Sequence, residues 1–461
     1  METLVFSLFM VLSIVLALMS RRGHSNQSSQ DFFVASRQFG AFLVFFLSAG
    51  EIYSINTMIG FPGGIYAKGA SYGIWFMGYV LLSYPVGYFL GPKIWAAGKR
   101  YNAITLPDLY KGHFGSRAVE VIAAIGAILF VLPWGQLQFT GLLFALKGMG
   151  WGLKPDELIG IAACFAFAYV AIAGVRASAF IAIMKDILMV VAILIVGAAV
   201  ASKVGVEPVF KLAATKVSNT INSSQLPFAM STMLFQSLGF YMFPFNVQSL
   251  FTAKSANTIR RTQIVMPLYM LMFPFLIVVT YFAISRGIHL DSPNDAFFAA
   301  AAALLPGWLL GLIEAGAALS GLVVLAGICL VIGPIVTRNL MPNLPESKQK
   351  AGAKAVIILY LVLSIFLTLF SSNLMVTIAN TAYFGVTQFL PGVLVVVFGI
   401  RIRGSAVAAG LVTGQVLAIA MYLSNITFGG INVGFLALLA NCVVIGLLHL
   451  VLGKKAAPTF A

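Results

Sequence analysis

Charge is what this sequence most lacks. Of its 461 residues only 9% are Asp, Glu, Lys or Arg, while 60% are hydrophobic; soluble domains carry about 25% charged residues. This composition excludes an ordinary soluble protein and indicates a membrane protein with many spans. The net charge of +15 does not indicate a nucleic-acid partner, because the basic residues lie between the apolar stretches.

Cysteine and histidine are also scarce. Three cysteines and four histidines stand singly along the chain, which excludes a disulfide framework and offers no ligand spacing for a metal ion. No ATP-binding motif or nucleophile constellation occurs, so neither an enzyme nor a cofactor is expected. The apolar start at 4–19 has no cleavage site after it and precedes Arg21 and Arg22, so we expect a span and not a signal peptide.

Long apolar segments are what the sequence has. A transmembrane helix needs about 20 mostly apolar residues, and thirteen segments approach this length. We therefore predict an all-α polytopic membrane protein with about 13 transmembrane helices in the lipid bilayer. The segments are 2–20, 40–64, 72–97, 117–147, 156–175, 178–202, 228–251, 263–285, 308–337, 354–371, 374–400, 404–424 and 431–453.

The basic residues predict the orientation. Most lysines and arginines fall in every second loop, among them Arg100, Arg176 and Arg338, and few fall in the alternate loops. Cytoplasmic loops carry the excess of positive charge. We therefore expect a protein of the cell inner (plasma) membrane, with its N-terminus outside and its C-terminus in the cytoplasm.

The second apolar segment is a poor continuous helix. Between Phe42 and Tyr66 it contains Glu51, Asn56 and several other polar residues, and the run Gly60-Phe61-Pro62-Gly63-Gly64 interrupts it. Broken backbone at membrane depth is tolerated where it is buried in protein or lines a wet cavity, and discontinuous helices hold the substrate and ion sites of secondary transporters. A kinked packing helix is the alternative, but it accounts poorly for a carboxylate inside a span.

A second interruption occupies the matching place in a second set of spans. Gly239 and Pro244 break the seventh segment, and spans two to six and seven to eleven form two sets of five with opposite orientation. This pattern is typical of inverted-repeat transporters. The predicted parts are a first peripheral helix and loop (1–30), a first repeat (31–203), a second, inverted repeat (204–400) and two peripheral helices (401–461).

Several motifs resemble those of the sodium:solute symporter family. They are Asp31–Arg37, Leu47–Gly50, Gly60–Gly63, Thr105–Asp108 with Phe114–Arg117, Gln248–Ser255 and Thr337–Asn339. The resemblance covers nearly the whole chain and implies the leucine-transporter fold of inverted five-helix repeats. Within the family the chain looks closest to the branch with bacterial monocarboxylate permeases, which implies a small anionic solute, a monocarboxylate.

The resemblance also implies the place of the principal sodium site. Its positions fall on Gly50 and Tyr53 in the broken helix and on Ser320, Val323 and Val324 in the ninth span. The family has hydroxyl groups where the two valines stand. Sodium binds oxygen ligands, as other hard cations do, so we predict that this site is degenerate.

The sixth span departs from the family in the same direction. Where the family has a hydroxyl residue before an aspartate, this chain has Lys185 before Asp186. Lys185 lies nine residues after Arg176, roughly 13 Å along a helix, and so within the hydrocarbon region. Snorkelling to the interface is the alternative; we favour a coupling role for Lys185 and Asp186, with a proton or sodium as the possible coupling ion.

The candidate substrate ligands come from the two broken spans and the eleventh span. Glu51, which could also pair with Lys185, lies near the first break, and a polar seam between helices is the alternative for the eleventh span. A sodium-coupled symporter that uses Asp186, a transporter-like sensor and a channel remain open as alternatives to a proton-coupled or ion-independent transporter. The candidates are Glu51, Asn56, Thr57, Tyr241, Asn246 and Gln388.

Overall fold

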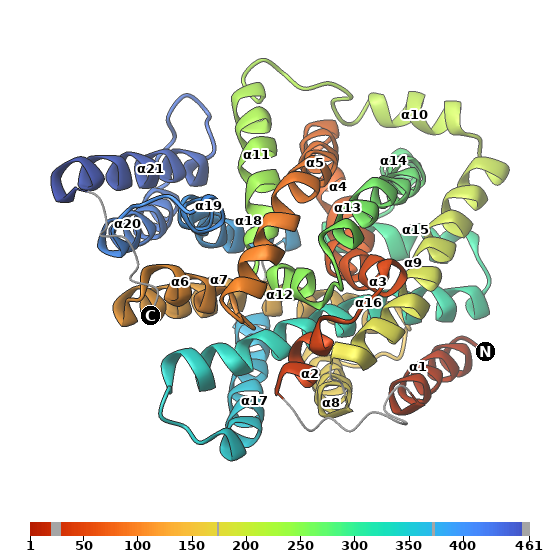
Figure 1. The fold of residues 1–461 in the computed structure, drawn as a ribbon. Coiled ribbons are helices and arrows are strands. Elements are labelled where there is room, and N and C mark those ends of the chain that lie inside the picture. The colour runs from red at the N-terminus through yellow and green to blue at the C-terminus, as the bar shows by residue number, and fades with distance from the viewer. Residues whose placement is uncertain (20–28, 173–174, 371–373, 454–461) are drawn as a thin grey trace.

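The computed structural model describes residues 1–19, 29–172, 175–370 and 374–453, and almost all of them are helical (Figure 1). The first half of the chain forms α1 Glu2–Met19, α2 Ser29–Val34, α3 Ala41–Ile52, α4 Phe61–Lys68, α5 Ala70–Arg100, α6 Leu106–Phe114, α7 Arg117–Gly148, α8 Pro155–Ile172, α9 Val175–Lys203 and α10 Val206–Ala214. The second half forms α11 Leu226–Gly239, α12 Pro244–Thr252, α13 Ala256–Val265, α14 Phe273–Arg286, α15 Ala296–Leu304, α16 Gly307–Pro334, α17 Glu346–Phe370, α18 Met375–Val386, α19 Leu390–Phe398, α20 Gly404–Leu423 and α21 Val433–Leu452.

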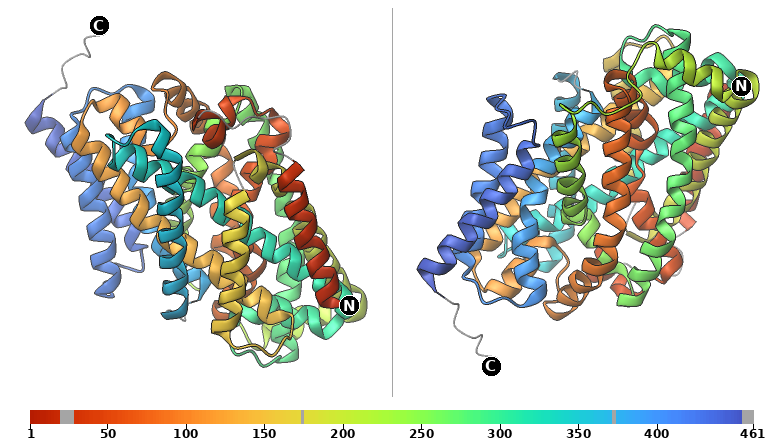
Figure 2. Two further views of the ribbon diagram at one scale, coloured as in Figure 1. Left: turned by 90° about the horizontal axis from the view of Figure 1, so that it is seen from below. Right: turned by 90° about the horizontal axis from the view of Figure 1, so that it is seen from above.

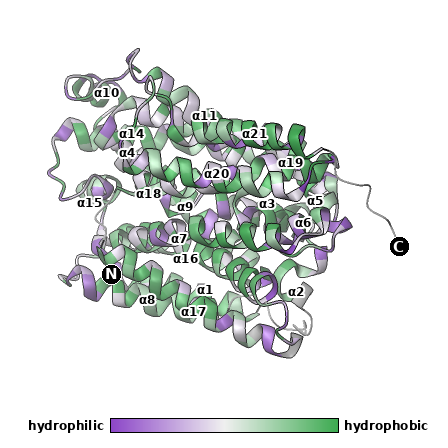
Figure 3. Cartoon of the chain, turned by 90° about the vertical axis from the view of Figure 1, so that its left-hand side faces the viewer, coloured by the Kyte–Doolittle hydropathy of each residue, from purple (hydrophilic) through white to green (hydrophobic). Residues whose placement is uncertain are grey.

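In the described residues, ten helical segments are long and apolar enough to cross a membrane, among them α13 joined to α14 and α18 joined to α19, and the bent pair α3–α4 makes an eleventh. Helices also occupy the predicted segments 156–175 and 228–251, as α8 and as α11 with α12, but these two segments are not among the eleven. The exact count of thirteen spans therefore stays a prediction. Figure 3 shows hydrophobic residues along the outer helices, with hydrophilic residues gathered toward the two ends of the bundle, as a bilayer requires.

Both predicted interruptions are real breaks in the backbone. Between α3 and α4 the chain leaves the helix at Tyr53 and re-enters through a π-helical turn, η2 (Asn56–Gly60), so that the two halves are bent by 44°. Between α11 and α12 it becomes extended at Phe243, and Pro244 opens the next helix. Proline suits the first turn of a helix and disfavours helical backbone in the residue before it.

The two broken spans meet at the centre of the bundle. α3 packs against α9 and α12, and α16 packs against α7, α9 and α12. α16 is the innermost helix, because nearly all of its apolar stretch is buried. The pair α20–α21 lies at one edge and α1 near the opposite edge, as both views of Figure 2 show.

A backbone bridge joins the start of α3 to the end of α12. The Phe39 amide donates to the Thr252 carbonyl at 3.0 Å, and the Lys254 amide donates to the Phe39 carbonyl at 3.0 Å. Arg37 reinforces this bridge by donating to the Ala103 carbonyl at 2.6 Å, beyond the end of α5. The bridge thus ties the N-terminal end of the first broken span to the C-terminal end of the second.

Two of the motifs that suggested the family come together at one end of the bundle. Thr105 begins α6 as its N-cap, and the η6 turn (Ile335–Leu340) extends α16 beside it. Asn339 donates to Asp108 at 2.7 Å and to Glu120 at 2.9 Å, and Arg338 contacts Asp108 at 3.1 Å. We call this group, Thr105, Asp108, Glu120, Arg338 and Asn339, the α6–η6 polar cluster.

Candidate functional site

Lys185 lies at the break between α3 and α4. Its Nζ donates to the Tyr53 carbonyl at 2.6 Å and approaches the Gly50 carbonyl at 3.4 Å. The side chain is fully buried, so it does not snorkel to the interface. The ammonium group therefore contacts the two carbonyls that the family resemblance assigns to a sodium ion.

Asp186 neutralises this lysine. Its carboxylate lies 2.6 Å from Lys185 Nζ, and the Tyr269 hydroxyl donates to it at 3.0 Å. Tyr269 also stacks on the Tyr53 ring, with centroids 4.7 Å apart. A buried ion pair is tolerated when its remaining groups are hydrogen-bonded, and α3, α9 and the turn before α14 together supply those partners here.

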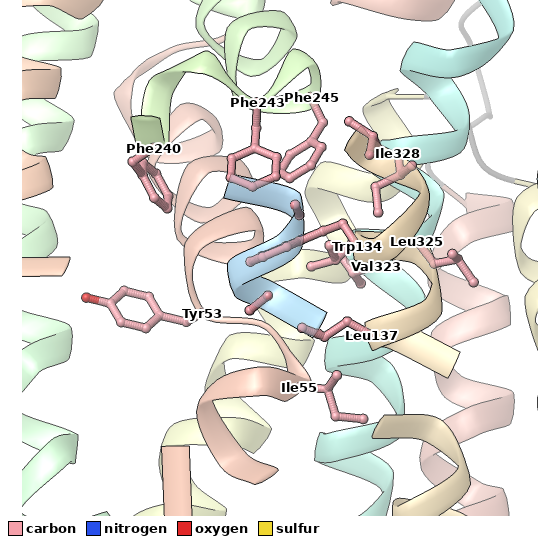
Figure 4. Close-up of a cluster of buried hydrophobic side chains, with 14 of the residues drawn as sticks. Tyr53, Ile55, Trp134, Leu137, Phe240, Phe243, Phe245, Val323, Leu325 and Ile328 are labelled. Atoms are coloured by element: carbon pink, nitrogen blue, oxygen red, sulfur yellow. The ribbon is translucent and has the colours of Figure 1, made fainter. Parts of the chain in front are cut away.

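The α16 side of the same site is apolar. Val323 faces Gly50, since a Cβ built on Gly50 would lie 3.7 Å from Val323 Cγ1 and 3.9 Å from Lys185 Nζ. The next residue, Val324, is fully buried. Ser320 donates its hydroxyl to the Gly316 carbonyl of its own helix at 2.7 Å. The valines contribute no oxygen, and Figure 4 shows Val323 among the hydrophobic side chains of this core.

The candidate substrate ligands of the broken spans are all buried. Asn56 and Thr57 lie in η2, which packs between α7 and α18, and Asn56 Oδ1 has no hydrogen-bond partner within the described parts of the chain. Tyr241 donates to Gln263 at 2.6 Å, and Asn246 donates to the Phe240 carbonyl at 2.7 Å. Of these four residues, Asn56 thus has an unpartnered side-chain oxygen, whereas Asn246 supports the backbone of the second break.

Gln388 belongs to a different contact. Its amide donates to the Gly434 carbonyl at 3.2 Å and accepts from Asn441 at 3.2 Å, both in α21. This is the seam between helices that the sequence left open as an alternative. We therefore leave Gln388 out of the proposed substrate site.

An aromatic group beside the second break was missed from the sequence. Phe243 lies 4.8 Å from Trp134 and 5.0 Å from Tyr383, centroid to centroid, and Figure 4 shows its ring directed toward Trp134. The indole Nε1 of Trp134 finds no acceptor among the described residues. The sequence signal for this group was a tryptophan close to Gln136 and Gln138 in an apolar span. Buried tryptophan usually donates its N–H to an acceptor, so its presence there could have indicated a binding position.

Glu51 does not form an ion pair with Lys185, whose carboxylate partner is Asp186. Its carboxylate turns instead toward α16, where Gly327 leaves room for it. Glu51 therefore follows Gly50 of the principal site in the sequence, but its side chain lies beside Gly327 and not at that site.

The fold and this site define a class, the secondary transporters of the leucine-transporter fold, which are not enzymes. A Na⁺-coupled sialic acid symporter, solved in a substrate-bound outward-open state, shares this fold over 99% of both chains, with a TM-score of 0.81 and 14% sequence identity. The model of the sodium:solute symporter family matches residues 32–414, and the chain belongs to that family.

Two bacterial relatives are similar in sequence. An uncharacterized symporter, YhjB of Bacillus subtilis (strain 168), is 26% identical over 460 residues, which cover 94% of each chain. A monocarboxylate transport permease protein of Rhizobium johnstonii is 29% identical over 345 residues, 73% of this chain and 70% of that protein.

Proposed function

We propose that this symporter-family protein transports a small monocarboxylate and that Lys185 takes the place of the principal sodium ion. One observation carries the proposal: the buried Lys185 ammonium contacts the Gly50 and Tyr53 carbonyls. The hydrocarbon side chains of Val323 and Val324 offer no hydroxyl oxygen that would favour a metal ion over this ammonium.

The same geometry favours coupling to protons. A protonated Lys185 binds the broken helix to α9 through the Tyr53 carbonyl, and a neutral amine would hold that carbonyl less strongly because charge-assisted hydrogen bonds are stronger. Loss of the proton thus loosens α3 from α9, and alternating access becomes linked to protonation. A lysine that keeps its proton throughout the cycle would instead give ion-independent transport.

The substrate class rests on the relative and on the site. The Rhizobium johnstonii protein is named a monocarboxylate permease, and this chain has amide, hydroxyl and indole groups at Asn56, Thr57 and Trp134 near the two breaks. Half-helix N-termini beside such groups favour carboxylates through their dipoles. Competition by pyruvate or lactate is expected, and competition by neutral sugars alone would contradict the assignment.

Uptake into proteoliposomes tests the role of the lysine. We expect a proton gradient to stimulate uptake by the wild type, and Lys185→Ala and Lys185→Met to lose that stimulation while retaining substrate exchange. Imposed sodium and proton gradients are compared in the same vesicles. A second candidate is a symporter with Asp186 as a sodium ligand. It would be favoured if a sodium gradient drives uptake by the wild type, with Lys185 in place, and if Asp186→Asn abolishes that uptake.

The observation for that second candidate is that Asp186 is a buried carboxylate 2.6 Å from Lys185 Nζ, the group that contacts the Gly50 and Tyr53 carbonyls. It stands second because both Lys185 and Tyr269 already occupy the carboxylate. A sodium ion at Asp186 would have to displace the lysine.

We also propose the orientation that the basic loops predict, with the N-terminus outside. A cysteine at Asn219, in the exposed segment between α10 and α11, is expected to react with an impermeant thiol reagent added to whole cells. A cysteine at Arg403, at the start of α20, is expected to react only after the inner face is opened. Labelling of both from outside would overturn the orientation.

A further inference from the structure

One carboxylate oxygen of Glu51 is buried without a hydrogen-bond partner among the described residues. The residue is 4% exposed, and Oε2 has no hydrogen-bond partner in the described parts of the chain. Lys185 interacts with it electrostatically, but the ion-pair contact of that lysine goes to Asp186. An isolated carboxylate in an apolar interior is very costly unless a counter-charge or a proton accompanies it.

The surroundings of this carboxylate are rich in oxygen. Glu51 lines a small cavity together with Ser178 of α9 and Gln248 and Ser249 of α12, and every residue around it is buried. Ser178 Oγ likewise has no hydrogen-bond partner among the described residues. Gln248 donates its side-chain N–H to the Leu330 carbonyl at 3.4 Å.

The cavity has the size of one small occupant. The space open to the centre of a water-sized sphere is about 10 Å³, close to the volume at which a cavity holds a single water. Two unpartnered oxygens from α3 and α9 thus line one void without bonding to each other. Gly327 keeps the void open on the α16 side, because a Cβ there would lie 3.2 Å from Glu51 Oε2 and still closer to Oε1.

We propose that Glu51, Ser178, Gln248 and Ser249 form a binding site for one sodium ion, separate from the degenerate principal site. Carboxylate, hydroxyl and amide oxygens are the ligands of a hard cation. A sodium ion supplies the missing positive charge, which a water molecule would not, and the negative charge of Glu51 excludes an anion. The ion would join α3 to α9 and α12 beside Gly327 of α16.

This inference does not depend on the substrate or on the role of Lys185, and its test is direct binding. Purified wild-type protein is expected to bind ²²Na⁺ saturably and to gain thermal stability in NaCl relative to choline chloride. Glu51→Gln is expected to lose saturable binding, and Ser178→Ala to weaken it by roughly ten-fold. Gly327→Ala is expected to weaken it as well, since the new methyl group displaces the carboxylate.

The matched control is Glu314→Gln, which neutralises a second buried carboxylate of the spans, on α16 far from the cavity lining. It is expected to bind sodium as the wild type does. Absence of saturable sodium binding in the wild type, or equal binding by Glu51→Gln, would overturn the site. A pH-dependent stability without any sodium effect, lost in Glu51→Gln, would show a proton in place of the ion and would also overturn it. If the site fails while the Lys185 variants behave as proposed, the proposed function stands.

Discussion

Two groups of buried carboxylates in this protein have opposite surroundings. In the α6–η6 polar cluster, both oxygens of Glu120 are engaged, one by Asn339 and the other by Arg117 and Lys111. At the centre of the bundle, by contrast, Glu51 has an oxygen without a partner within the described chain. Both residues are buried, so burial alone does not separate them.

The difference separates two uses of a buried charge. A carboxylate whose hydrogen bonds are complete adds order to the contact that it forms, and removing one partner is costly. A carboxylate left incomplete beside a void is a place where an ion, a proton or a ligand completes it. Asp186 stands between these extremes, because its partner Lys185 is shared with the Tyr53 carbonyl at the first break.

The largest effect is expected in the polar cluster. Asp108→Ala removes the acceptor of Arg338, Asn339 and the Ile104 amide, so the free energy of unfolding should fall by about 3–5 kcal/mol. Denaturation of the purified protein by SDS measures it. Asp291→Ala, which removes an exposed ion pair with Lys147, should leave the denaturation midpoint close to that of the wild type, because exposed ion pairs contribute little to stability. Similar losses in the two variants would contradict the comparison.

A second prediction concerns the central ion pair. Lys185→Met leaves Asp186 buried without its counter-charge and should lower the free energy of unfolding by about 3 kcal/mol. Combining it with Asp186→Asn removes the pair as a unit, and the double variant should recover at least about 1 kcal/mol of this loss. Thermal and SDS unfolding of the single and double variants form the cycle. Strictly additive losses would mean that the two side chains do not stabilise each other.

Glu51→Gln should behave unlike either of these changes. Because the carboxylate has an unpartnered oxygen, its neutralisation in sodium-free buffer should leave the free energy of unfolding unchanged or raise it by about 1 kcal/mol. The measurement is the same SDS titration. A loss as large as that of Asp108→Ala would place Glu51 with the structural carboxylates and remove the contrast.

The smallest effect is expected from restoring a hydroxyl at the principal site. Val323→Thr alone should change stability by about 1 kcal/mol or less, because a threonine hydroxyl can bond to the carbonyl one turn earlier in its helix. It should not create sodium dependence while Lys185 remains. The triple variant Val323→Thr, Val324→Ser and Lys185→Ala should show uptake that sodium stimulates. Adding Glu51→Gln to this triple variant should not abolish that stimulation. Sodium stimulation in Val323→Thr alone would show that Lys185 does not fill the site.

Much of the fold was predictable because it depends on local chemistry. Gly and Pro placed both breaks, and the motifs around Thr105 and Asn339 indicated the family that the whole-chain comparison shows. The number of spans was less predictable, because a break divides an apolar segment into helices too short to recognise. α11 and α12, of 14 and 9 residues, are such a case.

The positions of site residues were predictable where the backbone fixes them. The direction of a side chain was not predictable where it depends on contacts with residues distant in the sequence. Gly50, Tyr53 and Lys185 meet because the broken helix and α9 fix their places. The direction of the Glu51 side chain depends on Gly327, which is 276 positions away in the chain. No periodicity in either segment carries that information, and the same holds for Gln388 and its partners in α21.

The backbone bridge between Phe39 and the Thr252–Lys254 segment has a consequence for leakage. The bridged ends of α3 and α12 are held by two peptide hydrogen bonds, so neither can fray without the other. A local opening at that end would first have to break these two hydrogen bonds, so the backbone itself opposes leakage there.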